Sequence, residues 1–266
     1  MKYPFHFLSM KFISIPLFIL FFFPTPCCSG QISTDRPGFA NGTTIVPTGM
    51  LQLESGYQFS RLPQHKEHAL GQLLVRTAPL ERLEFRLGLN SYIATRDQVK
   101  NQSGFEDWSL GLKLKLAQGA DTPGIKSLNV SAIVETTLPT GSKAYSANKL
   151  QPFVMLVLDW ALPGNLAISP FMSYTLVSSQ SSQFNEFGGG VSLSVALSGR
   201  SGFFLEYYGV AAQSDYGADI SYLDGGLTYL ITDNCQLDLH SGQALSGKTP
   251  DYFMGIGFSY RFAMKK

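Results

Sequence analysis

The chain has 266 residues, of which 44% are hydrophobic, 13% aromatic and only 15% charged, with a formal net charge of +1 at pH 7. A balance this close to neutral indicates no polyanionic partner, so we expect no nucleic-acid binding.

The first thirty residues have the form of a secretory signal peptide. Lys2 and Lys11 give a positive start, Phe12–Phe23 is almost wholly apolar, and Pro24–Gly30 consists of small and turn-forming residues. The apolar run is too short for a membrane-spanning helix, which needs about 20 residues. We therefore assign residues 1–30 as a signal peptide. No later segment has the length and apolar character of a transmembrane helix.

Two of the three cysteines lie in this leader. Cys27 or Cys28 is an alternative site of lipid attachment, but Pro24 and Pro26 make a poor lipidation signal. Cys235 is then the only cysteine of the mature chain, so an internal disulfide is excluded.

From Met50 onward, apolar and polar residues alternate. In Leu83–Asn90 every second residue is leucine or phenylalanine, while Glu84, Arg86 and small or polar residues occupy the positions between them. Successive side chains of a β-strand point to opposite faces, so each such segment is a strand with one apolar and one polar face.

Twelve segments of this kind follow one another along the chain. They are Met50–Ser60, Leu70–Ala78, Leu83–Ile93, Phe105–Ala117, Leu128–Leu138, Leu150–Trp160, Leu166–Val177, Phe184–Leu197, Gly202–Ala212, Ile220–Ile231, Cys235–Leu245 and Tyr252–Phe262. Pro170 has no amide hydrogen for a strand ladder, so we expect it at a bulge or near a strand end. Short turns, including Pro79–Arg82, alternate with longer loops such as Arg61–Ala69.

The apolar faces carry no Asp, Glu, Lys or Arg, and a cation there would cost about 2–4 kcal/mol at the middle of a bilayer. An even number of such strands behind a signal peptide predicts an all-β fold, a transmembrane antiparallel β-barrel of about 12 strands in the bacterial outer membrane. The barrel would span residues 50–262, with a tail at 263–266. A soluble barrel or sandwich is the alternative, but its water-facing side would use more Lys and Glu.

Several segments resemble a family of outer-membrane proteins named for the meta-cleavage pathway of phenol degradation and labelled transporters. The similar segments are Ser33–Phe39, Val46–Gly56, Gly104–Lys113, Leu138–Gly141, Leu223–Leu230 and Gly255–Phe262. The resemblance extends from Thr34 to Phe262 and implies a porin-like barrel rather than a particular substrate. Barrels of this kind usually end on an aromatic residue that the barrel-assembly machinery reads. Here Ala263–Lys266 follow Phe262, so we expect that machinery to contact the Phe262 region.

By strand parity, many charged residues point into the lumen. Our candidate lumen-lining residues are Glu54, Arg86, Asp107, Lys113, Glu135, Asp159, Glu206, Asp224 and Arg261. They either line a passage for a small solute or pair across neighbouring strands to close the interior. For Asp107 we expect partners on the neighbouring strands, such as Arg86.

The segment before the first strand, residues 31–49, has no strand pattern. It either folds into the lumen as a plug or lies in the periplasm, and Asp35 and Arg36 favour the plug because they can join the lumen charges.

An enzyme is the rival class, since outer-membrane phospholipase A is a twelve-stranded barrel with a Ser/His/Asn set on its outer surface. Here His65 and His68 fall in a predicted loop, and His240 points inward while Ser241 points outward. Neighbours on opposite faces cannot act as nucleophile and base. We therefore expect no catalytic residues, no metal site and no cofactor. A structural or adhesive barrel with a closed lumen is a third reading.

We conclude from the sequence that the protein is an outer-membrane barrel that passes or binds small molecules, hydrophobic or aromatic ones in particular. Its expected partners are that solute, outer-membrane lipid and the assembly machinery.

Overall fold

The computed structural model describes residues 30–62, 65–97, 101–122, 125–178, 183–213, 219–246 and 252–264. The predicted signal peptide lies outside the described residues except for Gly30. Within the described ranges, no helix has the length and apolar character needed to cross a membrane.

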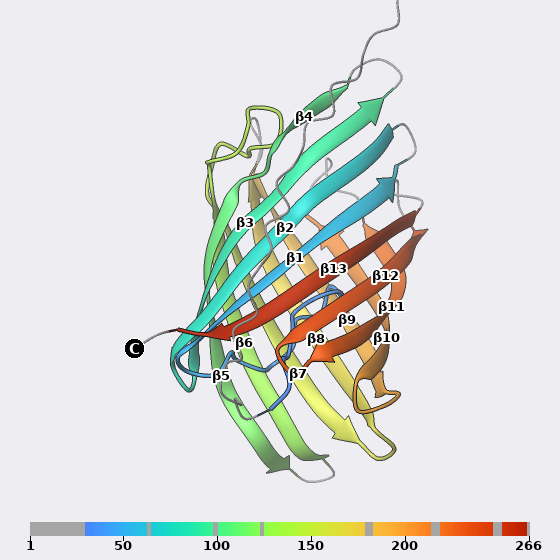
Figure 1. Cartoon of the computed structure of the whole chain (residues 1–266). Coiled ribbons are helices and arrows are strands. Elements are labelled where there is room, and N and C mark those ends of the chain that lie inside the picture. The colour runs from blue at the N-terminus through green and yellow to red at the C-terminus, as the bar shows by residue number, and fades with distance from the viewer. Residues whose placement is uncertain are drawn as a thin grey trace, which may run out of the picture.

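Thirteen strands make up the regular structure of the described residues (Figure 1). They are β1 (Met50–Arg61), β2 (His65–Leu80), β3 (Leu83–Asp97), β4 (Gln102–Phe105), β5 (Trp108–Thr122), β6 (Ile125–Leu138), β7 (Gln151–Leu162), β8 (Leu166–Ser178), β9 (Gln183–Ala196), β10 (Ser201–Ala212), β11 (Ile220–Thr232), β12 (Cys235–Ser246) and β13 (Tyr252–Ala263). The short β4 and the longer β5 both pair with β3, so they form one interrupted strand. The barrel thus has twelve strands, and the predicted fold class is confirmed.

The sheet closes on itself. With β4 and β5 counted as one strand, each strand pairs antiparallel with its neighbour in the chain, and β1 pairs with β13 from Met50↔Ala263 to Arg61↔Tyr252. Pairing the first strand with the last removes the long free edges of the sheet, whose amide and carbonyl groups a bilayer could not solvate. The ends of the barrel differ: short turns such as Glu81–Arg82 lie at one end, with the start of β1 and the end of β13. We call it the turn end and the opposite end the loop end.

The two faces of the wall follow the predicted parity. Along β13, Met254, Ile256 and Phe258 are exposed on the outside, whereas Ser259 and Arg261 are buried inside. Exposed leucine, phenylalanine and tyrosine side chains occur on strands all round the barrel, while the buried charged side chains come from the inward positions. An apolar outer face and a charged interior are the arrangement of an outer-membrane barrel.

The strand ends were predicted less well than their faces. β2 begins at His65, so His65 and His68 belong to a strand and not to a loop. It also continues through Pro79, and the turn is reduced to Glu81–Arg82. The alternation of apolar residues fades towards the strand ends, where polar residues still form ladder hydrogen bonds.

Pro170 lies inside β8 and causes no bulge, contrary to expectation. The register with β9 is continuous, with Pro170 opposite Val191. On the other side, the β7–β8 pairing is interrupted between Val157↔Phe171 and Trp160↔Ile168. The missing amide hydrogen of proline is therefore accommodated by a gap in one ladder rather than by an extra residue.

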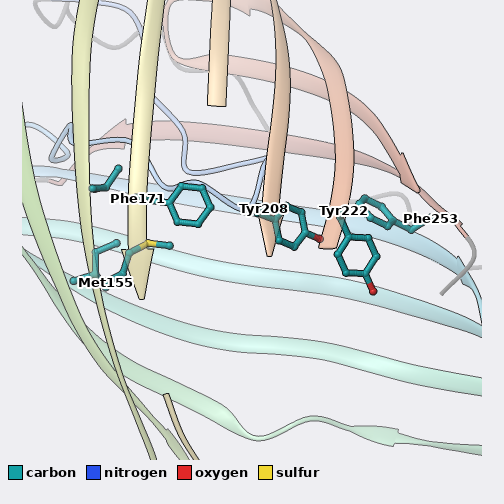
Figure 2. Packing of buried hydrophobic residues seen from close by; sticks show 7 residues of the cluster. Met155, Phe171, Tyr208, Tyr222 and Phe253 are labelled. Atoms are coloured by element: carbon teal, nitrogen blue, oxygen red, sulfur yellow. The ribbon is translucent and has the colours of Figure 1, made fainter. Parts of the chain in front are cut away.

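The barrel interior also contains an apolar cluster, which Figure 2 shows. Its members are Ile133, Met155, Val157, Phe171, Tyr208, Tyr222 and Phe253. They come from β6, β7, β8, β10, β11 and β13, so the cluster members lie along the part of the wall from β6 to β13.

The facing assignment can be tested on adjacent residues of β9. Val191 belongs to the outward set, whereas Ser192 is buried and lines an internal cavity. We expect Val191→Arg to block assembly because it places a cation in hydrocarbon, at a cost of about 2–4 kcal/mol near the bilayer centre. Ser192→Arg should still assemble. The heat-modifiable gel shift of the folded barrel measures both, and equal tolerance would contradict the assignment.

Candidate functional site

Residues 30–49, here called the inner segment, run through the lumen (Figure 1). Hydrogen bonds tie the segment to inward carboxylates on four well-separated strands of the wall. These are Glu54 of β1, Glu84 of β3, Asp159 of β7 and Glu206 of β10. The segment therefore contacts several sides of the barrel rather than lying along one strand.

The carboxylates serve as acceptors for backbone amides that have no strand partner. Glu206 accepts hydrogen bonds from the amides of Phe39 at 2.6 Å and Ala40 at 2.8 Å. Asp159 accepts from the amide of Thr43 at 2.8 Å and from its hydroxyl at 2.5 Å. A buried amide without a partner destabilises a fold by roughly 1–3 kcal/mol, so these acids make the irregular path of the segment possible.

Asp35 lies at the centre of the strongest ionic contacts. The Lys113 ammonium donates to both of its carboxylate oxygens, at 2.7 and 2.8 Å. Arg86 donates to Oδ2, and Arg76 lies 3.5 Å from the same oxygen. Burial favours the neutral carboxyl, but the positive charges of these three side chains hold the pKa of Asp35 well below its usual range.

Further carboxylates complete the network around these cations. Arg76 donates to Glu54 at 2.6 Å and to Glu84 at 2.9 Å, and Arg86 lies 3.3 Å from Glu84. We define the charge cluster as Asp35, Glu54, Arg76, Glu84, Arg86 and Lys113. It holds three carboxylates and three cations, so its buried charges balance. Glu135 lies at its margin, 3.5 Å from Arg86 and partly exposed.

Asp107 has a different role from the one expected. It accepts hydrogen bonds from the backbone amides of Gly141 at 2.8 Å and Ala147 at 2.9 Å, not from Arg86. Asp107 lies at the break between β4 and β5, and this break turns its side chain towards the chain between β6 and β7. The predicted ion pair is therefore wrong, and Asp107 orders a connection at the loop end.

The last two candidates lie apart from the charge cluster. Arg261 donates to the carbonyl of Gly30 at 2.8 Å and to Asn234 at 2.8 Å, so it fixes the beginning of the inner segment at the turn end. Asp224 lies opposite Glu206 in the β10–β11 register. Eight of the nine candidates thus lie on the inner face of the wall and Asp107 lies at the loop end, and together they serve several different contacts.

Sequence reasoning missed the aromatic side chains of the lumen. Phe39 of the inner segment stacks on Tyr208, with 4.5 Å between ring centroids and 6° between planes. Its ring also lies 5.7 Å from that of Phe171. Parity could have found both wall residues, since Tyr208 shares the face of Glu206 two positions earlier. The polar inward face that the alternation predicts therefore also carries aromatic side chains.

The inner segment separates two cavities. One, of about 630 Å³, is lined by Ser194, Ala196 and Gly202 near the turn end of their strands. Another, of about 450 Å³, is lined by Ser60 and Val210 near the loop end. Residues 35–38 line both cavities, so this part of the segment forms the partition between them.

The histidines do not assemble a catalytic set. His240 is buried on the inner face and Ser241 is exposed on the outer one. His68 accepts or donates a hydrogen bond with the Tyr57 hydroxyl at 2.8 Å. Across the described ranges, no group of three or more His, Cys, Asp or Glu side chains is placed to hold a metal ion.

A family model with the description "Putative MetA-pathway of phenol degradation" matches residues 34–262. No curated protein matches the chain in sequence. An outer membrane channel from Pseudomonas putida F1 has a similar structure, with a TM-score of 0.68 and 16% identity over 85% of this chain and 99% of that chain. The NanC porin follows with a TM-score of 0.54 and 13% identity, over 79% of this chain and 98% of its own. The KdgM porin has a TM-score of 0.51 and 10% identity, over 79% and 99%. At these identities the similarity shows the shared barrel fold.

Replacing the central acid of the charge cluster tests its contribution. Asp35→Asn keeps the shape of the side chain but leaves three buried cations with one carboxylate fewer. We expect a loss of about 3–5 kcal/mol in stability, together with a higher ion conductance in planar bilayers. Asp233→Asn, in an exposed turn, is the matched control and should change neither. A variant with unchanged melting and conductance would show that Asp35 does not hold the inner segment.

The acid dependence of stability follows from the lowered pKa of Asp35. A depressed folded-state pKa contributes stability above the unfolded-state value, which is near 3.8, and this contribution is lost as pH falls further. Melting followed by circular dichroism should therefore show no contribution from Asp35 to pH dependence between pH 7 and about pH 5. Below about pH 4 the wild type should lose stability more steeply than Asp35→Asn. Parallel slopes would contradict this assignment.

Proposed function

The chain belongs to this phenol-degradation family, and on that premise we propose that it is an outer-membrane channel for small molecules whose lumen the inner segment closes. The protein is a barrel of the bacterial outer membrane with the fold of known channels and porins. The observation that carries the proposal is the partition formed by residues 35–38 between two internal cavities. Solute on either side meets that partition before it reaches the other side.

The proposed solute is hydrophobic or aromatic. Met155, Val157 and Phe171 are buried inside this barrel and give its inner wall an apolar part that suits a hydrophobic solute. Ala40 of the inner segment packs against the same cluster. An aromatic solute can take over the stacking contact that Phe39 makes with Tyr208. The cavity volumes of about 630 and 450 Å³ suit one small molecule each.

Passage requires one part of the partition to move while the rest of the inner segment stays attached. The stretch around Phe39 is held to the wall by two amide contacts with Glu206 and by ring stacking. Asp35 is held by three cations. We therefore assign the motion to residues 37–42, which include Pro37 and Gly38 of the partition, and the anchoring role to the charge cluster around Asp35.

The protein surfaces also fit the expected partners. The exposed outer face would contact outer-membrane lipid, with the turn end in the periplasm. Phe262 pairs with Leu51 near the end of β13, where the assembly machinery would read the strand. A barrel with a permanently closed, structural lumen is the second candidate, favoured by the balanced charge cluster. An enzyme of the phospholipase type is not favoured by any contact of His240 or His68.

Liposome swelling with purified protein tests the proposal. We expect benzyl alcohol to enter faster than a sugar alcohol of similar size, and Phe39→Ala to increase the entry of both because the partition loses its stacking contact. Phe258→Ala is the matched control, since Phe258 is exposed on the outer face of β13 and lines neither cavity. No entry of either solute, with or without Phe39, would favour the structural barrel. Lipid hydrolysis by the protein would favour the enzyme.

A further inference from the structure

The cavity on the loop-end side of the partition has an unusual wall. Its volume is about 450 Å³, and its lining includes Phe39, Tyr208, Tyr222, Asp224, His240 and Phe253. Asp35 and Arg36 of the inner segment also line it, but on the barrel wall the aromatic rings lie around one carboxylate, that of Asp224.

The rings form a continuous series on neighbouring strands. Tyr208 and Tyr222 are stacked with 5.0 Å between centroids, and Tyr222 meets Phe253 edge-on at 6.0 Å. Figure 2 shows these three side chains one after another along the wall. Gly242 of β12 makes room for the last ring, because a Cβ there would lie 2.4 Å from Cζ of Phe253 and 2.5 Å from Cβ of Asp224. The glycine therefore lets the Phe253 ring lie beside the carboxylate.

The carboxylate itself lacks a positive partner. Asp224 is only 4% exposed, and its Oδ1 atom has no hydrogen-bond partner. Its neighbour across the strands is Glu206, a second buried acid. Among the ion pairs of the described residues, none involves either side chain. The two acids hydrogen-bond to each other, and without a cation nearby among the described residues, a bound positive charge would stabilise an ionised carboxylate in this pair.

The nearest cation of the inner segment is already engaged. Arg36 lines the same cavity, but it lies 3.5 Å from Asp238 and donates to Gln72 at 2.9 Å. Asp238 is paired in register with Thr228, four residues from Asp224, which is about 13 Å along the strand. Arg36 is thus directed away from the acid pair.

We propose that this cavity binds the ammonium group of an organic cation. Asp224, with Glu206 behind it, would supply the negative charge, and the faces of Tyr208, Tyr222 and Phe253 would surround the alkylated nitrogen. Aromatic faces attract such cations, and desolvation strengthens the attraction. A hard metal ion would instead need several oxygen ligands, and aromatic rings occupy those positions here. The inference rests on the proposed function, because it names the charged class of solute that the channel would accept.

The test compares a cation with its neutral isostere. Choline and 3,3-dimethylbutan-1-ol have nearly the same shape and differ in the charge of the quaternary centre. Isothermal titration of the full chain in detergent should show choline binding about tenfold more tightly or better. Equal affinity for the two compounds would overturn the proposal, since the cavity would then recognise only shape and apolar surface.

Variants locate the binding to this cavity. Asp224→Asn and Tyr222→Leu should each weaken choline binding by about tenfold without affecting the isostere. The matched controls are Asp219→Asn, an exposed acid just before β11, and Tyr229→Leu, on the outer face of β11. Neither control should change the affinity. If Asp224→Asn does not fold, as judged by the heat-modifiable gel shift, Tyr222→Leu and the wild-type comparison still decide the question.

The outcome is independent of the transport experiment. Choline binding without solute entry into liposomes would contradict the channel and leave the cation site standing. Entry of benzyl alcohol without any preference for choline over its isostere would support the channel and contradict the cation site.

Discussion

The need to satisfy buried polar groups inside a closed barrel determines the rest of this structure. The wall satisfies its own backbone through continuous antiparallel pairing. A chain without regular structure cannot do so, and inside the barrel its amides have little water to bind. Inward carboxylates meet this need by accepting hydrogen bonds from the backbone amides of the inner segment. They belong to Glu54, Glu84, Asp159 and Glu206. Inward acids therefore act as fixed attachment points for a segment that is not itself a strand.

Buried carboxylates in turn require positive charge, and the two sides of the lumen differ in how they receive it. Around Asp35, three cations balance three carboxylates, and this balance favours a fixed position for that part of the segment. Around Asp224 and Glu206, amides and aromatic rings replace the cations. The charges around Asp35 balance one another, whereas the acids Asp224 and Glu206 have no cation beside them in the described part of the chain and leave room for a positively charged ligand. This asymmetry gives the inner segment an anchored part and a part that contacts the proposed solute.

Strand faces were predictable from the sequence because a period of two places each residue inside or outside regardless of its neighbours. That rule correctly gave β13 its exposed Ile256 and buried Arg261. Strand ends and the Pro170 gap were not predictable, since they depend on pairing with another strand. The contact of Asp107 with Gly141 and Ala147 depends on the break between β4 and β5. The local sequence does not predict this break, because its pattern indicates one continuous strand. Strand parity places Tyr208 and Tyr222 on the inner face, two residues from Glu206 and Asp224. The aromatic inner wall was therefore predictable, but the alternation predicts polar residues in the lumen.

The most direct test fixes the inner segment to the wall. Within the stretch 37–42, the Asn41 side chain lies 3.8 Å from the sulfur of Met155 on β7, so the side chains at these two positions face each other. In a Cys235→Ser background, oxidation of the Asn41→Cys, Met155→Cys double variant would join the segment to β7. If the segment must move for passage, solute entry into liposomes should cease on oxidation and return on reduction. Unchanged entry in the fully cross-linked protein would contradict the account.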